Sequence, residues 1–167
     1  STSTHKVFEA GMTRIEYKGV KQDILQATLN VVGGYMEDGS LSYEAELSFF
    51  NQDTVQHIVY LSAPLPAVHD TIRVSCNNLE IDESFVFVSE TDKTPAGLFS
   101  NARNIMNVKV IGAEIYGHYK AGVIVGDGLC AKIENCHVKD AIVVSTPWLT
   151  KDGYDDGNNV GGIVGYL

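Results

Sequence analysis

The sequence predicts an all-β protein whose C-terminal half is a β-solenoid, a coil of short strands stacked turn upon turn. Three observations predict this fold. A glycine-aliphatic phrase recurs at residues 96–99, 121–124 and 161–166. A second phrase recurs at residues 105–110 and 133–138, at an offset of 28 residues. Its apolar residues alternate with polar ones, which is typical of strands, and repetition at such a period is typical of solenoids.

Residues 1–54 predict an antiparallel β cap or a small β-domain that packs on the first coil. Apolar residues alternate with polar ones over 25–31 and 41–49, and Asp38-Gly39 lies between the two runs. An Asp-Gly pair in that position is a strong hairpin signal. A cap is expected because the terminal coil of a solenoid has unpaired strand edges and an open apolar core.

A short helix is the competing interpretation of the first run. Asp23 followed by Gln26 resembles a capping box, and Gly33-Gly34 would end such a helix. The alternation over seven residues favours the strand.

Residues 55–167 predict the β-helix, and the repeat is clear from residue 96. Equivalent side chains are expected to stack in columns about 4.8 Å apart. The last interval between glycine phrases is 15 residues longer than the first, and the excess falls on residues 145–159. Insertions of this kind form loops, often on the binding face. The residues predicted to define the repeat are Gly97, Gly122, Gly162, Ile105, Ile133, Val110 and Val138.

The two phrases resemble the Glug-motif repeats of large bacterial surface and secreted proteins. Residues 161–166 read Gly-Gly-Ile-Val-Gly-Tyr, and residues 133–138 read Ile-Glu-Asn-Cys-His-Val. The resemblance covers residues 96–167, and residues 58–74, with their Pro-Leu-Pro, resemble the first coil of such helices. It implies a right-handed parallel β-helix in an adhesin-like or protease-associated protein that is secreted or displayed on the bacterial surface. It implies no catalytic residues.

The charge of the chain disfavours two classes of partner. The net charge is −9, and −8 of it falls before residue 96. An acidic half opposes nucleic acid and anionic membranes, and no apolar run approaches the ~20 residues that span a bilayer. The chain begins without Met or an apolar leader, which we interpret as a mature or trimmed chain. That interpretation is compatible with secretion.

The three cysteines are Cys76, Cys130 and Cys136. An odd number leaves at least one free thiol or an intermolecular bond, and the absence of a Cys-x-x-Cys pair disfavours a zinc site. Cys136 matches Val108 in the repeat, so we expect it to be buried and reduced. A bond between Cys130 and Cys136 stays open, because sequence does not establish its geometry.

An acidic loop is the candidate metal site. It contains Asp152, Asp155 and Asp156, whose carboxylates are ligands that calcium prefers. The spacing is not that of an EF-hand, and a plain solvated loop is the alternative. Calcium is the one cofactor that the sequence suggests.

Four aromatic residues at or near predicted loops are the candidate ligand contacts, since aromatic rings offer contact area at low entropic cost. They are Trp148, Tyr154, Tyr116 and Tyr119. For Trp148, packing against the solenoid is an equally good interpretation.

No catalytic residue is predicted. His69-Asp70 could orient a base, but no Gly-x-Ser-x-Gly phrase accompanies it, and His137 is expected to face solvent. The outward residues of a polysaccharide-active groove would be Lys109, Lys132, Lys139 and Asp140.

Three functions fit these observations. The first is a non-enzymatic surface module that binds a glycan or a protein. The second is an assembly subunit that docks through its open solenoid end, because the sequence stops inside a repeat phrase at Leu167. That end is expected to be covered by further repeats or by self-association. The third is a polysaccharide lyase or hydrolase with a shallow groove.

Overall fold

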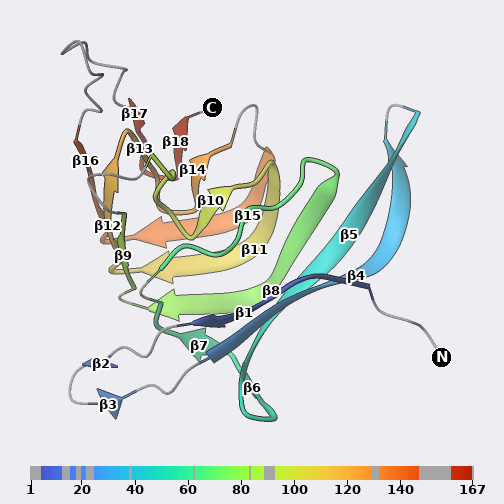
Figure 1. Cartoon of the computed structure of the whole chain (residues 1–167), viewed down its shortest axis with the longest axis horizontal. Helices are drawn as coiled ribbons and strands as arrows, with labels where there is room; N and C mark the ends of the chain where they lie inside the picture. The colour runs from blue at the N-terminus through green and yellow to red at the C-terminus, as the bar shows by residue number, and fades with distance from the viewer. Residues whose placement is uncertain are drawn as a thin grey trace.

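The chain is all-β and winds into a parallel β-solenoid of about three turns in the computed structural model (Figure 1). The predicted fold class is therefore confirmed. The part of the chain that the structure describes contains no helix, and hence no helix that could cross a membrane. The described residues are 5–12, 16–17, 20–21, 25–37, 39–61, 63–82, 84–88, 93–128, 132–146 and 159–166.

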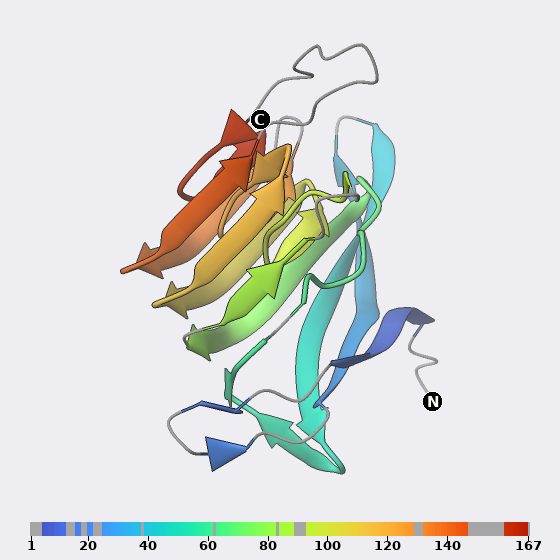
Figure 2. The same ribbon diagram turned by 60° about the vertical axis from the view of Figure 1, so that its left-hand side comes forward.

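Successive turns of the solenoid add strands to the same sheets, and Figure 2 shows them as layers coloured from green to red. The longest sheet contains β8 (Ile72–Asp82), β11 (Asn104–Ile111) and β15 (Lys132–Lys139). The second contains β9 (Phe85–Phe87), β12 (Glu114–His118) and β16 (Ile142–Thr146). The third contains β10 (Phe99–Asn101), β14 (Val125–Asp127) and β18 (Val164–Tyr166). β13 (Lys120–Ala121) pairs with β17 (Asn159–Val160).

The register between β11 and β15 confirms the repeat of 28 residues. Ile105 lies opposite Ile133, and Val110 lies opposite Val138. Ile105 and Val110 are buried, and their counterparts on β15 are partly buried against the same core. The apolar residues of the phrase therefore point inward and form columns along the solenoid.

The glycine phrases are also in register, but the last one is displaced by one residue. Ala121 pairs with Val160, 39 positions later, and not with Gly161. Gly161 rather than Gly162 therefore continues the predicted glycine column. A pair of adjacent glycines does not reveal in sequence which member takes the position, so the expectation for Gly162 is wrong by one residue.

Two of the repeat glycines let successive turns approach closely. A Cβ on Gly97 would lie 2.6 Å from the carbonyl oxygen of Gly122. A Cβ on Gly122 would lie 2.4 Å from the amide nitrogen of Gly165. Neither position has room for a side chain, whereas a Cβ on Gly162 would have no neighbour within 4 Å.

The N-terminal half forms antiparallel strands, β1 (His5–Met12), β4 (Leu25–Glu37), β5 (Ser40–Asn51) and β6 (Thr54–Gln56), beside a short pair, β2 (Glu16–Tyr17) and β3 (Val20–Lys21). Glu37 lies opposite Ser40 across the turn, which confirms the hairpin. Gly33 and Gly34 pair inside β4, so the competing helix does not form there. Asp23 and Asp38 lie outside the described residues.

The antiparallel strands continue the longest sheet of the solenoid. β5 pairs with β4 on one side and, in parallel, with the first half of β8 on the other, from Tyr43 opposite Ile72 to Glu46 opposite Ser75. β7 (Ile58–Val59) pairs with the second half of β8. The resulting strand order is β1-β4-β5-β8-β11-β15. The N-terminal strands thus cover the first turn.

Apolar side chains of the described residues pack in the interior of the solenoid. Leu61, Ile115 and Val123 line a cavity of about 10 Å³ between the sheets. That volume is about what a single water needs. This cavity has no room for a ligand larger than a water molecule.

Candidate functional site

The outer face of the sheet β9-β12-β16 is the candidate binding site. Side chains alternate between the two faces of a strand, and here Val86 and Ile115 point inward and are buried. The residues on either side of them point outward. On a solvated wall we expect these positions to be polar.

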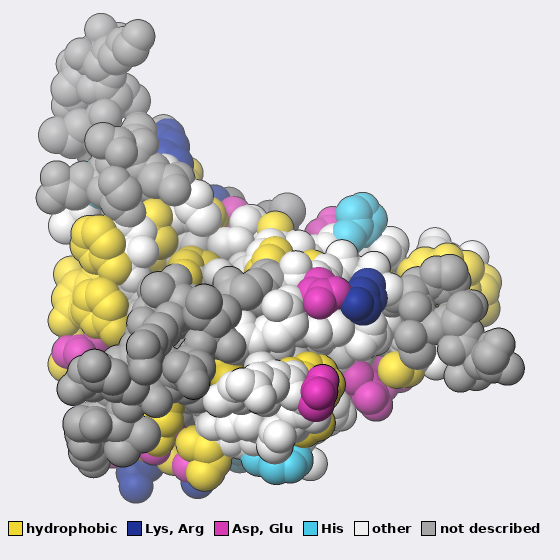
Figure 3. Space-filling model, turned by 60° about the horizontal axis from the view of Figure 1, so that its bottom comes forward, with side chains coloured by type: hydrophobic (Ala, Val, Ile, Leu, Met, Phe, Trp, Pro, Cys, Tyr) yellow, Lys and Arg dark blue, Asp and Glu magenta, His cyan; other side chains and the backbone are white. Residues whose placement is uncertain are grey.

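Most of the outward positions are apolar instead. The exposed fraction is 44% for Phe85, 56% for Phe87, 51% for Ile142 and 41% for Val144. Tyr116 lies among them and is partly exposed. We call Phe85, Phe87, Tyr116, Ile142 and Val144 the apolar wall. In Figure 3, hydrophobic side chains gather along the left edge, the side on which these strands lie in Figure 1.

The register arranges the apolar wall in two rows that cross the turns. One row contains Phe85, Glu114 and Ile142, and the other contains Phe87, Tyr116 and Val144. The rings of Phe85 and Tyr116 lie 5.4 Å apart between centroids and are tilted by 40°. The two rings therefore form one continuous aromatic surface across neighbouring strands.

A polar pair stands inside the apolar wall. The hydroxyl of Tyr116 donates to Oε1 of Glu114 at 3.4 Å. At the far end of the same strands, His118 and Thr146 are hydrogen-bonded through Nδ1 and Oγ1. The three strands contain no lysine or arginine, and Glu114 is their one carboxylate.

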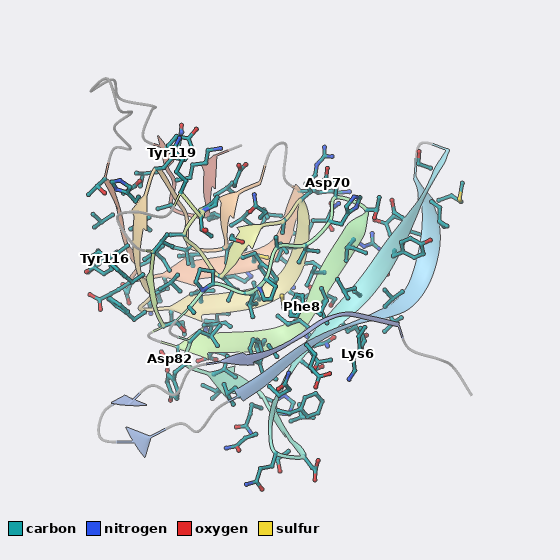
Figure 4. The ribbon with its side chains drawn as sticks, viewed as in Figure 1. Lys6, Phe8, Asp70, Asp82, Tyr116 and Tyr119 are labelled. Carbon is teal, nitrogen blue, oxygen red and sulfur yellow. The ribbon has the colours of Figure 1, made fainter. Side chains whose placement is uncertain are left out.

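The two predicted tyrosines have different surroundings, as Figure 4 shows. Tyr116 belongs to the apolar wall. Tyr119 lies at the corner after β12 with φ of +104°, and the Nζ atoms of Lys93 and Lys120 each lie 5.0 Å from its ring centroid. At these distances Tyr119 makes cation–π contacts with two lysines. The structure therefore does not bring Tyr119 into the apolar wall.

The other predicted contacts lie outside the described residues. These are Trp148 and Tyr154 of the aromatic set and Asp152, Asp155 and Asp156 of the calcium loop. In the part of the chain that is described, no group of His, Cys, Asp and Glu side chains could hold a metal ion.

Sequence reasoning missed four members of the apolar wall, namely Phe85, Phe87, Ile142 and Val144. Their segments read Phe-Val-Phe and Ile-Val-Val, and a run of consecutive apolar residues predicts a strand buried on both faces as readily as an apolar outer face. The strand register could have indicated these four residues, because their segments lie beside Tyr116 in the neighbouring turns.

The long sheet carries an ion pair on its outer face. Nη2 of Arg73 donates to Oε2 of Glu44 at 2.9 Å, and the guanidinium lies 4.4 Å from the ring centroid of Tyr35. The hydrogen bond to Glu44 raises the pKa of Arg73 above its ordinary value. Further along the sheet, Lys109, His137 and Lys132 are exposed, as are Lys139 and Asp140. The expectation that His137 faces solvent is confirmed.

The adjacent pair His69-Asp70 does not act as a unit. Nδ1 of His69 lies 3.0 Å from Oγ1 of Thr71. Oδ2 of Asp70 accepts a hydrogen bond from Nη1 of Arg103 at 3.2 Å. The carboxylate therefore pairs with an arginine and does not orient the imidazole.

The two described cysteines are free and differ in burial. Cys76 is buried, and burial raises the pKa of its thiol. Cys136 lies opposite Val108, as expected, but it is only half-buried, because β15 pairs with a described strand on one side only. The expectation that Cys136 is buried is thus wrong in degree. Cys130 lies outside the described residues, so the reduced state of Cys136 stays a prediction.

Comparison with known proteins finds no family model that matches the chain, no matching curated protein and no matching solved structure. The site must therefore be interpreted from its own geometry.

Proposed function

We propose that this protein is a non-enzymatic, adhesin-like binding module that binds an uncharged glycan on the apolar wall. The observation that carries the proposal is the pair of outward rows of apolar side chains on β9, β12 and β16. Exposed apolar surface of this kind marks interaction sites on soluble domains.

The mixture of groups favours a sugar over other ligands. A sugar ring has an apolar C–H face and a rim of hydroxyl groups. The rings of Phe85 and Tyr116 match the apolar face, and the carboxylate of Glu114 can accept hydrogen bonds from hydroxyl groups beside them. The absence of lysine and arginine from the three strands favours an uncharged glycan over an acidic one.

The setting of this module in our proposal is the bacterial cell surface or the secreted fraction, as the Glug-like phrases imply. The ligand is a glycan of a host or of another bacterium. A polysaccharide lyase or hydrolase is the less favoured alternative, because Arg73, one arginine on an outer face, is already bonded to Glu44.

A glycan array probed with the whole chain tests the proposal. We expect binding to neutral glycans and little binding to sialylated or sulfated ones. Phe87→Ser should abolish the signal because it removes a ring that is 56% exposed, and Leu41→Ser is a matched control. Leu41 is 50% exposed on β5, remote from the apolar wall. Both are surface substitutions, which usually change stability by less than about 0.5 kcal/mol.

Two outcomes would contradict the proposal. One is glycan binding that Phe87→Ser leaves intact, which would place the site elsewhere. The other is the absence of any glycan signal together with saturable binding of a purified protein that Phe87→Ser abolishes. The apolar wall would then be a protein-binding surface.

A further inference from the structure

Strand β12 presents three outward side chains of two kinds. Glu114, Tyr116 and His118 are two residues apart in sequence, so all three point to the outer face of the sheet. The aromatic ring therefore lies in the middle of the strand, with a polar side chain on each side of it. A ligand that lies over the ring meets a polar group at either edge.

The neighbouring strands extend this order into rows that cross the sheet. The central row is apolar in every strand and contains Phe87, Tyr116 and Val144. We call this row the apolar track. The row on one side of it contains the carboxylate of Glu114. On the other side His118 lies opposite Thr146, and Nδ1 and Oγ1 of this pair are hydrogen-bonded.

The apolar track is straight because the sheet is regular. β12 pairs with β9 and with β16 in parallel and without a shift of register. In the long sheet, by contrast, β11 and β8 pair with a shift between Met106 and Val108. Neighbouring strands lie about 4.8 Å apart, which is close to the length of one sugar residue in an extended chain. A straight glycan with one sugar residue per turn therefore stays in register with the track.

The side chains of the apolar track are held in place by their neighbours. The ring of Tyr116 packs against the ring of Phe85, and its hydroxyl donates to Oε1 of Glu114. Val144 is β-branched, which restricts its side-chain torsion. Binding therefore costs little side-chain entropy at these positions.

An extended glycan chain with flat faces fits this arrangement. When every linkage is equatorial, as in β-1,4-linked glucose, the chain is a flat ribbon with C–H groups on its two faces and hydroxyl groups along its two edges. One face matches the apolar track, and the two edges then lie beside Glu114 and beside the pair of His118 and Thr146. A chain of α-1,4-linked glucose curls, so its sugar faces leave a straight track.

We propose that the apolar wall binds a ribbon-like, equatorially linked glycan that runs across the turns along the apolar track, parallel to the solenoid axis. This inference rests on the proposed glycan-binding function and names its ligand class and the residues that select it. Glu114 accepts hydrogen bonds from hydroxyl groups on one edge, and His118 and Thr146 contact those on the other. A chain along β12 would instead bury the carboxylate of Glu114 under a C–H face, which disfavours that direction.

Isothermal titration calorimetry with the whole chain tests the shape of the ligand. The probes are β-1,4-linked oligosaccharides of glucose, mannose and N-acetylglucosamine, and the matched controls are α-1,4-linked glucose oligosaccharides of equal length. We expect at least one β-1,4 series to bind, with an affinity that rises ~10-fold or more from the disaccharide to the trisaccharide. The α-1,4 series should bind at least ~10-fold more weakly.

Two substitutions on β16 test the direction of the chain. Val144→Ser shortens the apolar track by one residue, so the trisaccharide should bind no more tightly than the disaccharide. Ile142→Ser is the matched control, because Ile142 is 51% exposed against 41% for Val144 but lies beside the track. It should weaken binding by less than ~3-fold. Both are surface substitutions, and an unchanged circular dichroism spectrum would verify that the variants fold.

Two further substitutions test the edges of the ribbon. Glu114→Gln and Thr146→Val keep the shape of each side chain and remove a hydrogen-bonding group, so each should weaken binding ~5-fold. Thr54→Val is the matched control, because Thr54 is exposed on β6 of a different sheet, and it should leave the affinity unchanged. Unchanged affinity in both edge variants would overturn the roles assigned to these residues.

This inference and the proposed function fail separately. Suppose that a glycan binds and that Phe87→Ser abolishes its binding. The ribbon is then overturned if α-1,4-linked chains bind as tightly as β-1,4-linked ones, if no β-1,4 oligosaccharide binds, or if Val144→Ser and Ile142→Ser have equal effects. The proposed function survives each of these results. The absence of binding to any glycan overturns both.

Discussion

Nδ2 of Asn135 donates a hydrogen bond to Oδ1 of Asn107 at 2.9 Å, and both residues have positive φ angles, 48° and 63°. Nδ2 of Asn107 in turn lies 3.3 Å from Oγ of Ser75 in the preceding turn. The three side chains thus form a ladder across three turns. Asparagine tolerates the left-handed conformation better than most residues do. The ladder explains why an asparagine stands in both copies of the repeated phrase.

Replacing Asn107 tests the ladder. Asn107→Ala should lower the free energy of unfolding by about 2–3 kcal/mol, because it removes two hydrogen bonds and puts a less tolerant residue at a positive φ. Asn107→Gly loses the same two hydrogen bonds but keeps the backbone conformation available, so it should cost about 1–2 kcal/mol. Urea denaturation measures both. Equal losses for the two variants would mean that the backbone conformation contributes nothing.

Two glycines of the repeated glycine phrase should respond very differently to replacement by alanine. Gly122→Ala would place a Cβ 2.4 Å from the backbone of the next turn, so we expect a loss of more than ~3 kcal/mol or failure to fold. Gly162→Ala has open space around its Cβ and should change stability by less than about 0.5 kcal/mol. Thermal unfolding compares them. Comparable melting temperatures would show that the turns do not approach this closely.

A buried charge should be tolerated differently in successive turns. Ile105→Asp places a carboxylate at a position that is 1% exposed, and we expect the variant not to fold. Ile133 occupies the same column but is only partly buried, so Ile133→Asp should give a folded, destabilised protein.

Circular dichroism of the two variants tests the pair. We expect a strand spectrum for Ile133→Asp and none for Ile105→Asp. Equal effects of the two substitutions would contradict the difference in burial.

The two described thiols should react at different rates. Burial raises the pKa of both thiols, and Cys76 is buried whereas Cys136 is half-buried. Only the thiolate reacts with alkylating reagents. We expect slow labelling of Cys136 in the native state, still slower labelling of Cys76, and rapid labelling of both in denaturant. Peptide mapping after timed alkylation measures the rates. Faster labelling of Cys76 than of Cys136 would contradict the burial.

The raised pKa of Cys76 makes the free energy of unfolding depend on pH. A thiol whose pKa is raised by folding stabilises the folded state. This stabilisation is complete at pH values below the pKa of the thiol in the unfolded chain, which is near 9.0 for Cys76. As pH rises above that value, the unfolded thiol ionises and the folded one does not, so the stability falls. Cys76→Ala should reduce this alkaline loss. An unaltered slope above pH 9 would argue against a buried neutral Cys76.

The repeat and the hairpin were predictable because both depend on local patterns. The offset of 28 residues between Ile105 and Ile133 is visible in the sequence, and the same offset appears in the strand register. The position of Gly162 was not predictable to the residue, because the long insertion before it leaves the alignment of two adjacent glycines ambiguous. Of the five residues of the apolar wall, the sequence indicated only Tyr116 as a ligand contact. Alternation tells which residues share a face, but Phe-Val-Phe is apolar on both faces.

By itself, the sequence determined which residues of the 28-residue repeat stack. Parallel strands with a fixed period place equivalent residues in one column, so Cys136 follows Val108. Only the tertiary structure decided how far each of them is buried. Val108 is covered by a turn on either side, whereas Cys136 has a described turn on one side only. Burial depends on what lies above a residue as well as on its own identity, and that information is not local.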